Sequence, residues 1–176
     1  MRRITQLSGN ISEWCLKRKV IHSFRNTMMG SNKMIRIAHR GNTSGPDPIN
    51  ENKPDYIIEA ASRYDVEVDV WKDNDSWWLG HDYPQYKVDE QYIMNDRFWC
   101  HAKSLKAFEA LLRLNARCFW HQEDDYTLTS TGIIWTYPLQ ETTHRSVIVC
   151  QSMEQTLHYY KKRIHGICSD YVGGIR

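Results

Sequence analysis

Side chains that can transfer protons, hold a cation or bind an anion gather where short apolar runs of the chain end. These residues are His39, Arg40, Glu67, Asp69, His81, His101 and Lys103. Imidazoles serve as general acids and bases, carboxylates hold hard divalent ions, and guanidinium and ammonium groups stabilise phosphate charge. The set therefore indicates a site for phosphoryl chemistry.

Glu67 and Asp69 are two positions apart in the apolar run 66–71. In a strand, residues at this spacing point to the same face. Two neighbouring carboxylates repel each other unless a cation lies between them, and oxygen ligands suit Mg²⁺ or Ca²⁺. The pattern is also typical of a solvated antiparallel strand whose acids face water. We predict a metal site here, with that solvated strand as the alternative.

His39 and His81 each close an apolar run, one before and one after the acidic pair along the chain. A lone histidine is more often structural than catalytic. Two imidazoles beside a metal and an arginine form a more specific set, because one can take a proton from an attacking hydroxyl while the other protonates the leaving oxygen. We therefore predict that the pair is catalytic.

Four short motifs in this order resemble the glycerophosphodiester phosphodiesterase family, within the wider group of phospholipase-C-like phosphodiesterase barrels. They are AHRG after the first run, EN at Glu51-Asn52, EVDV at 67–70 and GHD at 80–82. The late stretch GICSDYVGG is similar to the closing strand of that family, so the resemblance spans residues 35–173. A long insertion after the third strand is absent, which makes this chain a short variant.

The resemblance implies a role for each matching residue. The implied roles are catalysis for His39 and His81, phosphate binding for Arg40 and Lys103, metal binding for Glu67, Asp69 and His101, and support from Glu51. His101 stands where the family has a third acidic ligand, and a nitrogen ligand favours softer ions than a carboxylate does. We expect one divalent ion, Mg²⁺ or Ca²⁺, with Mn²⁺ as a further candidate.

The expected function is metal-dependent hydrolysis of glycerophosphodiester-like substrates by two-histidine acid–base catalysis. One alternative is a phospholipase-D-like lyase that stops at a cyclic phosphate. Another is a barrel that binds a phosphorylated ligand without turning it over, which would fit the missing third carboxylate.

Eight short runs rich in aromatic and β-branched residues predict strands. They are 35–39, 66–71, 76–81, 97–102, 117–121, 132–136, 147–150 and 165–169. Helical periodicity occurs at 55–63, 104–114 and 153–163, with Ser104 as an N-cap. Strands joined partly by helices favour an α/β fold, a compact (β/α)8 TIM-type barrel with several helices missing or shortened.

Charge divides the 176 residues into a basic N-terminal extension, 1–33, and a barrel domain, 34–176. The extension has seven basic residues against one acidic residue and room for one helix, whereas the domain has sixteen basic against twenty acidic residues. An acidic domain argues against nucleic acid as a partner, which leaves a small-molecule phosphodiester.

Hydropathy and cysteine usage predict the protein's surroundings. No apolar run approaches the ~20 residues of a transmembrane helix, so we expect no transmembrane segment. Five dispersed cysteines without a C-x-x-C pair favour a reducing compartment, the cytoplasm. The predicted strands have apolar residues on the outside of the barrel, and too few helices are predicted to cover them. We therefore expect a homo-oligomer whose interface buries this uncovered outer wall of the barrel.

Overall fold

The computed structural model describes residues 34–175, so the helix predicted within 1–33 lies outside the described residues. The strands are β1 (Ile35–His39), β2 (Asp65–Asp73), β3 (Ser76–Leu79), β4 (Tyr86–Val88), β5 (Phe98–Ala102), β6 (Cys118–Phe119), β7 (Tyr126–Leu128), β8 (Ile134–Thr136), β9 (Ser146–Cys150) and β10 (Gly166–Ser169). The helices are α2 (Pro54–Ala61), α3 (Glu90–Ile93), α4 (Leu105–Arg113) and α5 (Met153–Tyr160), followed by the 3₁₀ turn η1 (Val172–Gly174).

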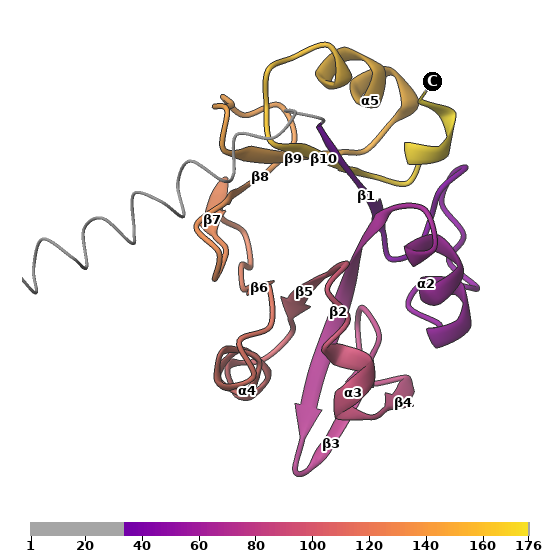
Figure 1. Cartoon of the computed structure of the whole chain (residues 1–176), viewed down its shortest axis with the longest axis vertical. Coiled ribbons are helices and arrows are strands. Elements are labelled where there is room, and N and C mark those ends of the chain that lie inside the picture. Colours follow the sequence, from indigo (N-terminus) through magenta and orange to yellow (C-terminus); the bar gives the residue numbers. More distant parts are fainter. Residues whose placement is uncertain (1–33, 176) are drawn as a thin grey trace, which may run out of the picture. The chain divides into compact units, whose positions relative to one another are not determined.

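All ten strands belong to one curled, mixed sheet (Figure 1). Its parallel part has the order β6-β5-β2-β1-β10-β9-β8. Three strands are antiparallel to their neighbours: β3 to β2, β4 to β3, and β7 to β8. Among residues 34–175, β6 and β8 do not pair with each other, so the sheet forms a half-barrel.

The predicted (β/α)8 barrel is therefore wrong. The run 76–81 was expected to be a parallel barrel strand, but only Asn74 and Asp75 separate β2 from β3, which is too short for the crossover that parallel strands need. The two strands form a hairpin in which Trp71 pairs with Trp78. Hydropathy places strands but does not reveal their direction, and the three-residue strands β4 and β7 have too little pattern to be recognised.

Side chains of β2 alternate between the two faces of the curled sheet. Val66, Val68 and Val70 are buried on the outer face with residues of α2 and α4. Glu67 and Asp69 consequently point to the inner face. Deeper on that face lies an apolar floor formed by Ile37, Trp99, Phe119, Trp135, Val147 and Cys168. The sheet thus holds a polar layer next to an apolar one inside its curl.

The few helices lie where they cover the outer face. Phe98 and Cys100 of β5 pack in one cluster with Ala107 and Leu111 of α4, which begins at the predicted N-cap Ser104. A second cluster on the outer face joins β9 and β10 with Tyr159 of α5. The outer wall from which we predicted a homo-oligomer is therefore covered by helices in these places, and the homo-oligomer itself stays a prediction.

In the part of the chain that the structure describes, no helix has both the length and the apolar character that crossing a bilayer requires.

The packing of α4 against β2 and β5 gives a direct test of this arrangement. Leu111 is fully buried, whereas its neighbour Leu112 is 43% exposed. We expect Leu111→Ala to lower the free energy of unfolding by about 2–5 kcal/mol, because it leaves a cavity. Leu112→Ala should change it by less than about 0.5 kcal/mol. Urea unfolding measures both, and equal effects would contradict the assigned face of α4.

Candidate functional site

A tight turn ends β1 and brings Arg40 back over the sheet. Arg40 and Gly41 have positive φ values of 53° and 91°, and the Asn42 amide donates to the His39 carbonyl at 2.9 Å. A Cβ atom on Gly41 would lie 2.7 Å from the ring of Tyr56, so only glycine fits. The strand stops here because the chain must turn to place both His39 and Arg40 at the inner face.

Asp69 is the most completely surrounded carboxylate of the site. It is fully buried and accepts hydrogen bonds from Nδ2 of Asn52 at 2.9 Å and from Nδ1 of His101 at 3.0 Å. The Lys103 ammonium lies 3.3 Å away, and Nε of Arg40 lies at 3.2 Å without the alignment of a hydrogen bond. Burial alone would raise the pKa of Asp69, but these donors outweigh it and hold the pKa well below its usual range.

Glu67 has much weaker compensation for its charge. It is also buried, and the Arg40 amide donates to its Oε2 at 3.2 Å. Its nearest imidazole nitrogens are those of His101 at 3.7 Å and His39 at 4.0 Å. Burial and the neighbouring charge of Asp69 raise the pKa of Glu67 above its ordinary value. The negative charge of Glu67 is therefore only weakly compensated by the groups around it.

Asp170, directly after β10, orients His39. Nδ1 of His39 donates to Oδ1 of Asp170 at 2.9 Å, which leaves Nε2 free to act as a base. Asn42 donates to the same Asp170 oxygen at 2.9 Å and to Oε1 of Glu51 at 2.8 Å. Burial would lower the pKa of His39, but the hydrogen bond with Asp170 and the charge of Glu67 raise it above its usual value.

Glu51 does not line the cavity but contacts Arg40, which does. Its Oε2 accepts from Nη1 of Arg40 at 3.1 Å. Together with Asp69, it holds the guanidinium between two carboxylates, and the supporting role of Glu51 stays a prediction.

His81 reaches the site from the antiparallel hairpin. The turn after β3 returns to the level of Asp69, where the Gly80 amide donates to the Asp69 carbonyl at 3.2 Å. Nδ1 of His81 donates to Asp82 at 2.6 Å, so Nε2 is again the free nitrogen. Burial lowers the pKa of His81 below its ordinary value. The pKa of His39 is thus raised, whereas the pKa of His81 is lowered.

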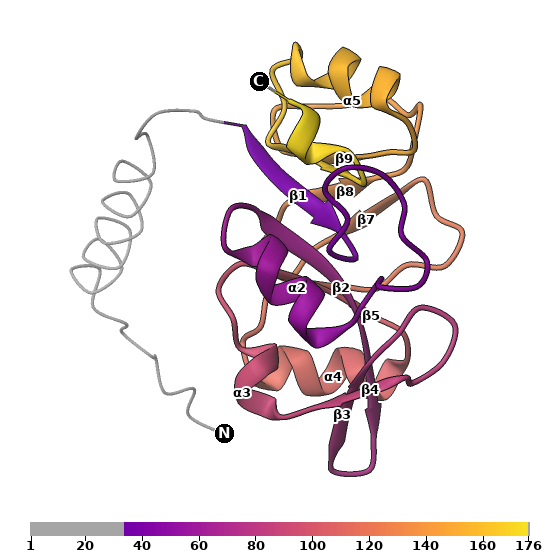
Figure 2. The ribbon, with the colours of Figure 1, turned by 90° about the vertical axis from the view of Figure 1, so that its right-hand side faces the viewer.

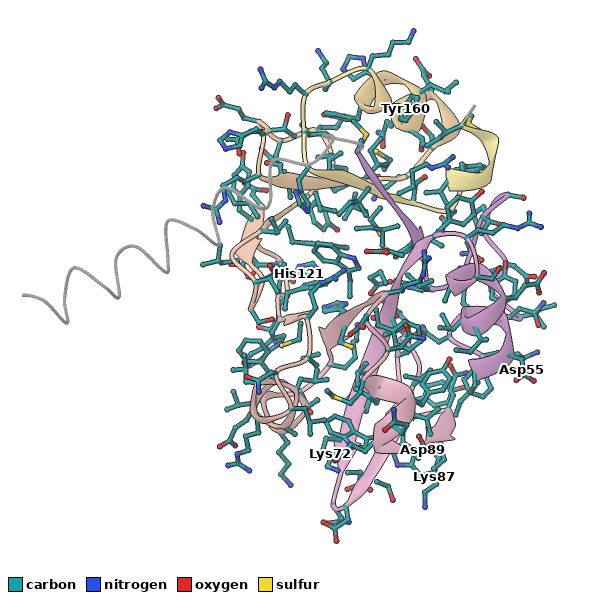
Figure 3. The ribbon with its side chains drawn as sticks, in the orientation of Figure 1. Asp55, Lys72, Lys87, Asp89, His121 and Tyr160 are labelled. Carbon is teal, nitrogen blue, oxygen red and sulfur yellow. The ribbon has the colours of Figure 1, made fainter. Side chains whose placement is uncertain are left out.

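His101 belongs to a stack of rings on the inner face. Its ring lies nearly parallel to those of Phe119 at 5.0 Å and His121 at 4.8 Å. Figure 3 shows His121 on the inner side of the curled sheet. Burial lowers the pKa of His121 to about 4, so this third imidazole is neutral at physiological pH.

A cavity of about 570 Å³ unites most of the predicted site. Six of the eight predicted residues line it: His39, Arg40, Glu67, His81, His101 and Lys103. The other two, Asp69 and Glu51, do not line the cavity, but their carboxylates lie 3.2 and 3.1 Å from the Arg40 guanidinium.

Several residues of the site were not assigned a role from the sequence. Asn42 and Asn52 are buried: Asn42 bridges Glu51 and Asp170, and Asn52 binds Asp69, while Asp170 directly follows β10. Asn52 has a φ of 62°, in the region that asparagine tolerates better than most residues. The available signal was their place in the motifs: Asn42 follows AHRG directly, Asn52 belongs to EN, and Asp170 belongs to GICSDYVGG. Trp135 is buried in the apolar floor.

The donor set fits one divalent cation. Ligand atoms of Glu67, Asp69 and His101 lie within 4.8 Å of one another, and two of these side chains are fully or almost fully buried carboxylates. Two oxygen ligands and one nitrogen ligand suit Mg²⁺ or Mn²⁺, and a cation would meet the charge need of Glu67. The acidic pair faces the interior of the curl, so the alternative of acids facing water does not apply.

Comparisons of the chain with family models, with curated proteins and with solved structures give no match.

Metal binding is testable through stability. Adding Mg²⁺, Ca²⁺ or Mn²⁺ in turn should raise the melting temperature with at least one ion, since binding to the folded state stabilises it by about 2.7 kcal/mol at a hundred times Kd. Glu67→Gln should lose most of this gain without destabilising the ion-free protein, because the carboxylate is uncompensated there. Asp82→Asn, an exposed acid beside His81, is the matched control. Melting temperatures that respond to none of the three ions would contradict the site.

Proposed function

We propose that the protein is a metal-dependent phosphodiesterase that acts on glycerophosphodiester-like substrates. One observation carries the proposal: a single cavity is lined by two carboxylate-bound imidazoles, by Glu67 and His101 of the possible metal site, and by two side-chain cations that Asp69 holds from below the surface. Each imidazole has Nδ1 on a carboxylate and Nε2 free, the arrangement that general acid–base catalysis requires.

In the proposed reaction, a hydroxyl of the substrate next to the phosphate attacks phosphorus. His39, whose neutral form has an unprotonated Nε2, takes the hydroxyl proton as the new P–O bond forms. The bond to the leaving alcohol breaks, and that oxygen takes a proton from His81. The products are a cyclic phosphate and an alcohol. Water then opens the ring with the two roles exchanged. The raised pKa of His39 and the lowered pKa of His81 favour the opposite first roles, with His81 as the base and His39 as the acid, and the reaction balances in the same way with the two exchanged.

Positive groups of the cavity balance the charge that develops on the phosphate oxygens. Arg40 and Lys103 are held in place by Asp69 at 3.2 and 3.3 Å, so little reorganisation is needed when the charge appears. The divalent ion, held by Glu67, Asp69 and His101, would supply Lewis-acid stabilisation of the same oxygens. Asp170 is a positioning residue, because it acts by orienting His39.

We also propose that the protein works in a reducing compartment such as the cytoplasm. The cysteines that the structure describes, Cys100, Cys118, Cys150 and Cys168, are free and buried. Burial raises the pKa of Cys100 and of Cys168, so both stay protonated and behave as small apolar side chains.

Turnover of a water-soluble aryl phosphodiester tests the proposed function. His39→Ala and His81→Ala should each reduce turnover about 10²-fold or more with unchanged folding, because each removes a proton-transfer partner. His158→Ala on α5 controls for the loss of an exposed histidine. Phosphorus NMR of the product separates a hydrolase from a lyase that releases the cyclic phosphate.

Near-normal turnover in either folded variant would contradict the acid–base assignment. A folded wild-type protein that turns over nothing with Mg²⁺, Ca²⁺ or Mn²⁺ would instead favour a phosphoryl-ligand-binding protein.

A further inference from the structure

Arginine residues gather at the end of the sheet opposite the candidate site, where the chain enters its parallel strands. One arginine lies within the three residues before each of β2, β5, β6, β9 and β10. These arginines, which we call the arginine edge, are Arg63, Arg97, Arg117, Arg145 and Arg163. The same three-residue segments contain one acid, Asp96.

The backbone places the arginine edge along one end of the curled sheet. The strands that follow these arginines all run parallel to their neighbours in the ring, so their amino ends lie at the same end. The carbonyls of Arg97, Arg117 and Arg145 each accept a hydrogen bond, at 2.9–3.0 Å, from an amide within the first three residues of the neighbouring strand. In Figure 2, β1 begins on the left-hand side of the domain, whereas the loop that follows it extends to the right-hand side.

Two members of the arginine edge have partners within the domain. The Arg117 guanidinium lies 2.9 Å from a carboxylate oxygen of Asp65 and 4.5 Å from the centroid of the Trp99 ring. Arg145 donates to the Gly132 carbonyl. These two arginines therefore contribute to the fold, and their substitution would not separate binding from stability.

The other three arginines carry charge that the domain does not compensate. Arg63, Arg97 and Arg163 are exposed, and the structure shows no ion pair between them and an acid of residues 34–175. Lys161 and Lys162 directly precede Arg163 and are also exposed. The positive charge of these five side chains is thus available to a partner outside the domain.

The basic N-terminal extension joins the chain at the same end of the sheet. Residues 1–33 contain seven basic residues against one acidic residue, and Met34 directly precedes β1. In the sheet, β1 lies between β2 and β10, the strands that Arg63 and Arg163 precede. The most basic stretch of the sequence therefore leads directly into the middle of the arginine edge.

The net negative charge of the domain, from which we expected no nucleic-acid partner, is unevenly distributed. Exposed acids lie beside the cavity instead: Asp82 follows the lining residue His81, and Glu123 follows the lining residue Gln122. Local potentials near a surface depend on the charges gathered there, and not on the net charge alone. The domain can therefore present a basic surface at one end although its total charge is negative.

The chemistry of this end favours nucleic-acid phosphates over a lipid surface. Guanidinium groups bind phosphate through paired hydrogen bonds, and Ser, Thr and Asn side chains commonly add further phosphate contacts. The same segments contain Ser62, Asn95, Asn115 and Thr143. Proteins that bind lipid interfaces combine basic groups with apolar side chains that insert. None of the exposed large apolar side chains among residues 34–175 lies in these segments.

The shape of this end favours backbone contacts with a flexible strand. Four of the five segments belong to connections of three to five residues between a helix and the next strand, so they offer no helix that could enter a groove and read base edges. Neighbouring strands of a sheet are about 4.8 Å apart, so their arginines form a closely spaced, curved row. A single strand can follow such a curve, whereas duplex DNA has a persistence length of about 150 base pairs.

We propose that the arginine edge binds single-stranded nucleic acid through its phosphate backbone, without preference for base sequence. The surface lies away from the cavity and involves none of the candidate catalytic residues. This inference does not depend on the proposed phosphodiesterase function, and its test involves no turnover.

Fluorescence anisotropy of a labelled single-stranded DNA oligonucleotide of mixed sequence, titrated with the full-length protein at low salt, tests the proposal. We expect binding that weakens as salt is added, because each phosphate contact contributes a slope of about −0.7 in log K against log salt. Arg63→Gln combined with Arg163→Gln should weaken binding at least about tenfold and reduce the slope by about 1.4, since two contacts are lost. Both side chains are exposed, so the melting temperature should not change.

Lys87→Gln combined with Lys106→Gln is the matched control, because it removes the same charge from exposed positions in β4 and in the first turn of α4. This control should bind the oligonucleotide like the wild type. Excess aryl phosphodiester should not displace the oligonucleotide, because the cavity lies at the other end of the sheet.

The proposal would be overturned by a wild-type protein that does not change the anisotropy. An arginine variant that binds as tightly as the wild type would also overturn it, because the extension alone would then account for binding. Equal losses in the lysine control would show that net charge matters and the arginine edge does not. Displacement by the aryl phosphodiester would place the oligonucleotide in the cavity. Binding to phosphatidylserine vesicles without binding to the oligonucleotide would assign the surface to anionic lipid and would likewise refute the proposal.

Discussion

The burial of Asp69 as a charged group is the constraint on which the rest of the site depends. An ionised carboxylate inside a protein is tolerated only when donors surround it. Asp69 has Asn52, His101, Lys103 and Arg40 around it, and these come from a loop and from the ends of two strands. Four separate segments must therefore come together for one carboxylate to be stable. The same requirement assembles the cations that would bind a phosphate.

The two carboxylates differ in how fully nearby donors and cations compensate their charge, and we attribute the reactivity of the site to this difference. Asp69 is fully compensated, whereas Glu67, two residues away on the same face, is not. A protein built only for stability would gain by replacing Glu67 with an apolar side chain, because an uncompensated buried charge is costly. Its retention next to His39 and His101 favours a cation as its missing partner. Similarly, Asp170 and Asp82 each occupy Nδ1 of one histidine and leave the other nitrogen free.

The sequence could predict which residues meet better than it could predict how the sheet is built. The alternation of Glu67 and Asp69 with valines indicated one polar and one apolar face, and both faces are present. The direction of β3 was not accessible from hydropathy, since it depends on the two-residue connection at Asn74-Asp75. His81 nevertheless lines the cavity, because the hairpin returns its end to the level of Asp69. The roles of Asn42 and Asn52 depend on long-range contacts that no local pattern records.

We propose that one divalent ion binds between Glu67, Asp69 and His101, next to His39. Titration with paramagnetic Mn²⁺, observed in the imidazole proton–nitrogen NMR spectrum, measures this most directly, because each histidine reports its own distance from the ion. We predict that the signals of His101 and His39 broaden first, at less than one equivalent, while those of the exposed His144 and His158 stay sharp. Equal broadening of all histidines, or earlier broadening of the exposed pair, would contradict the account.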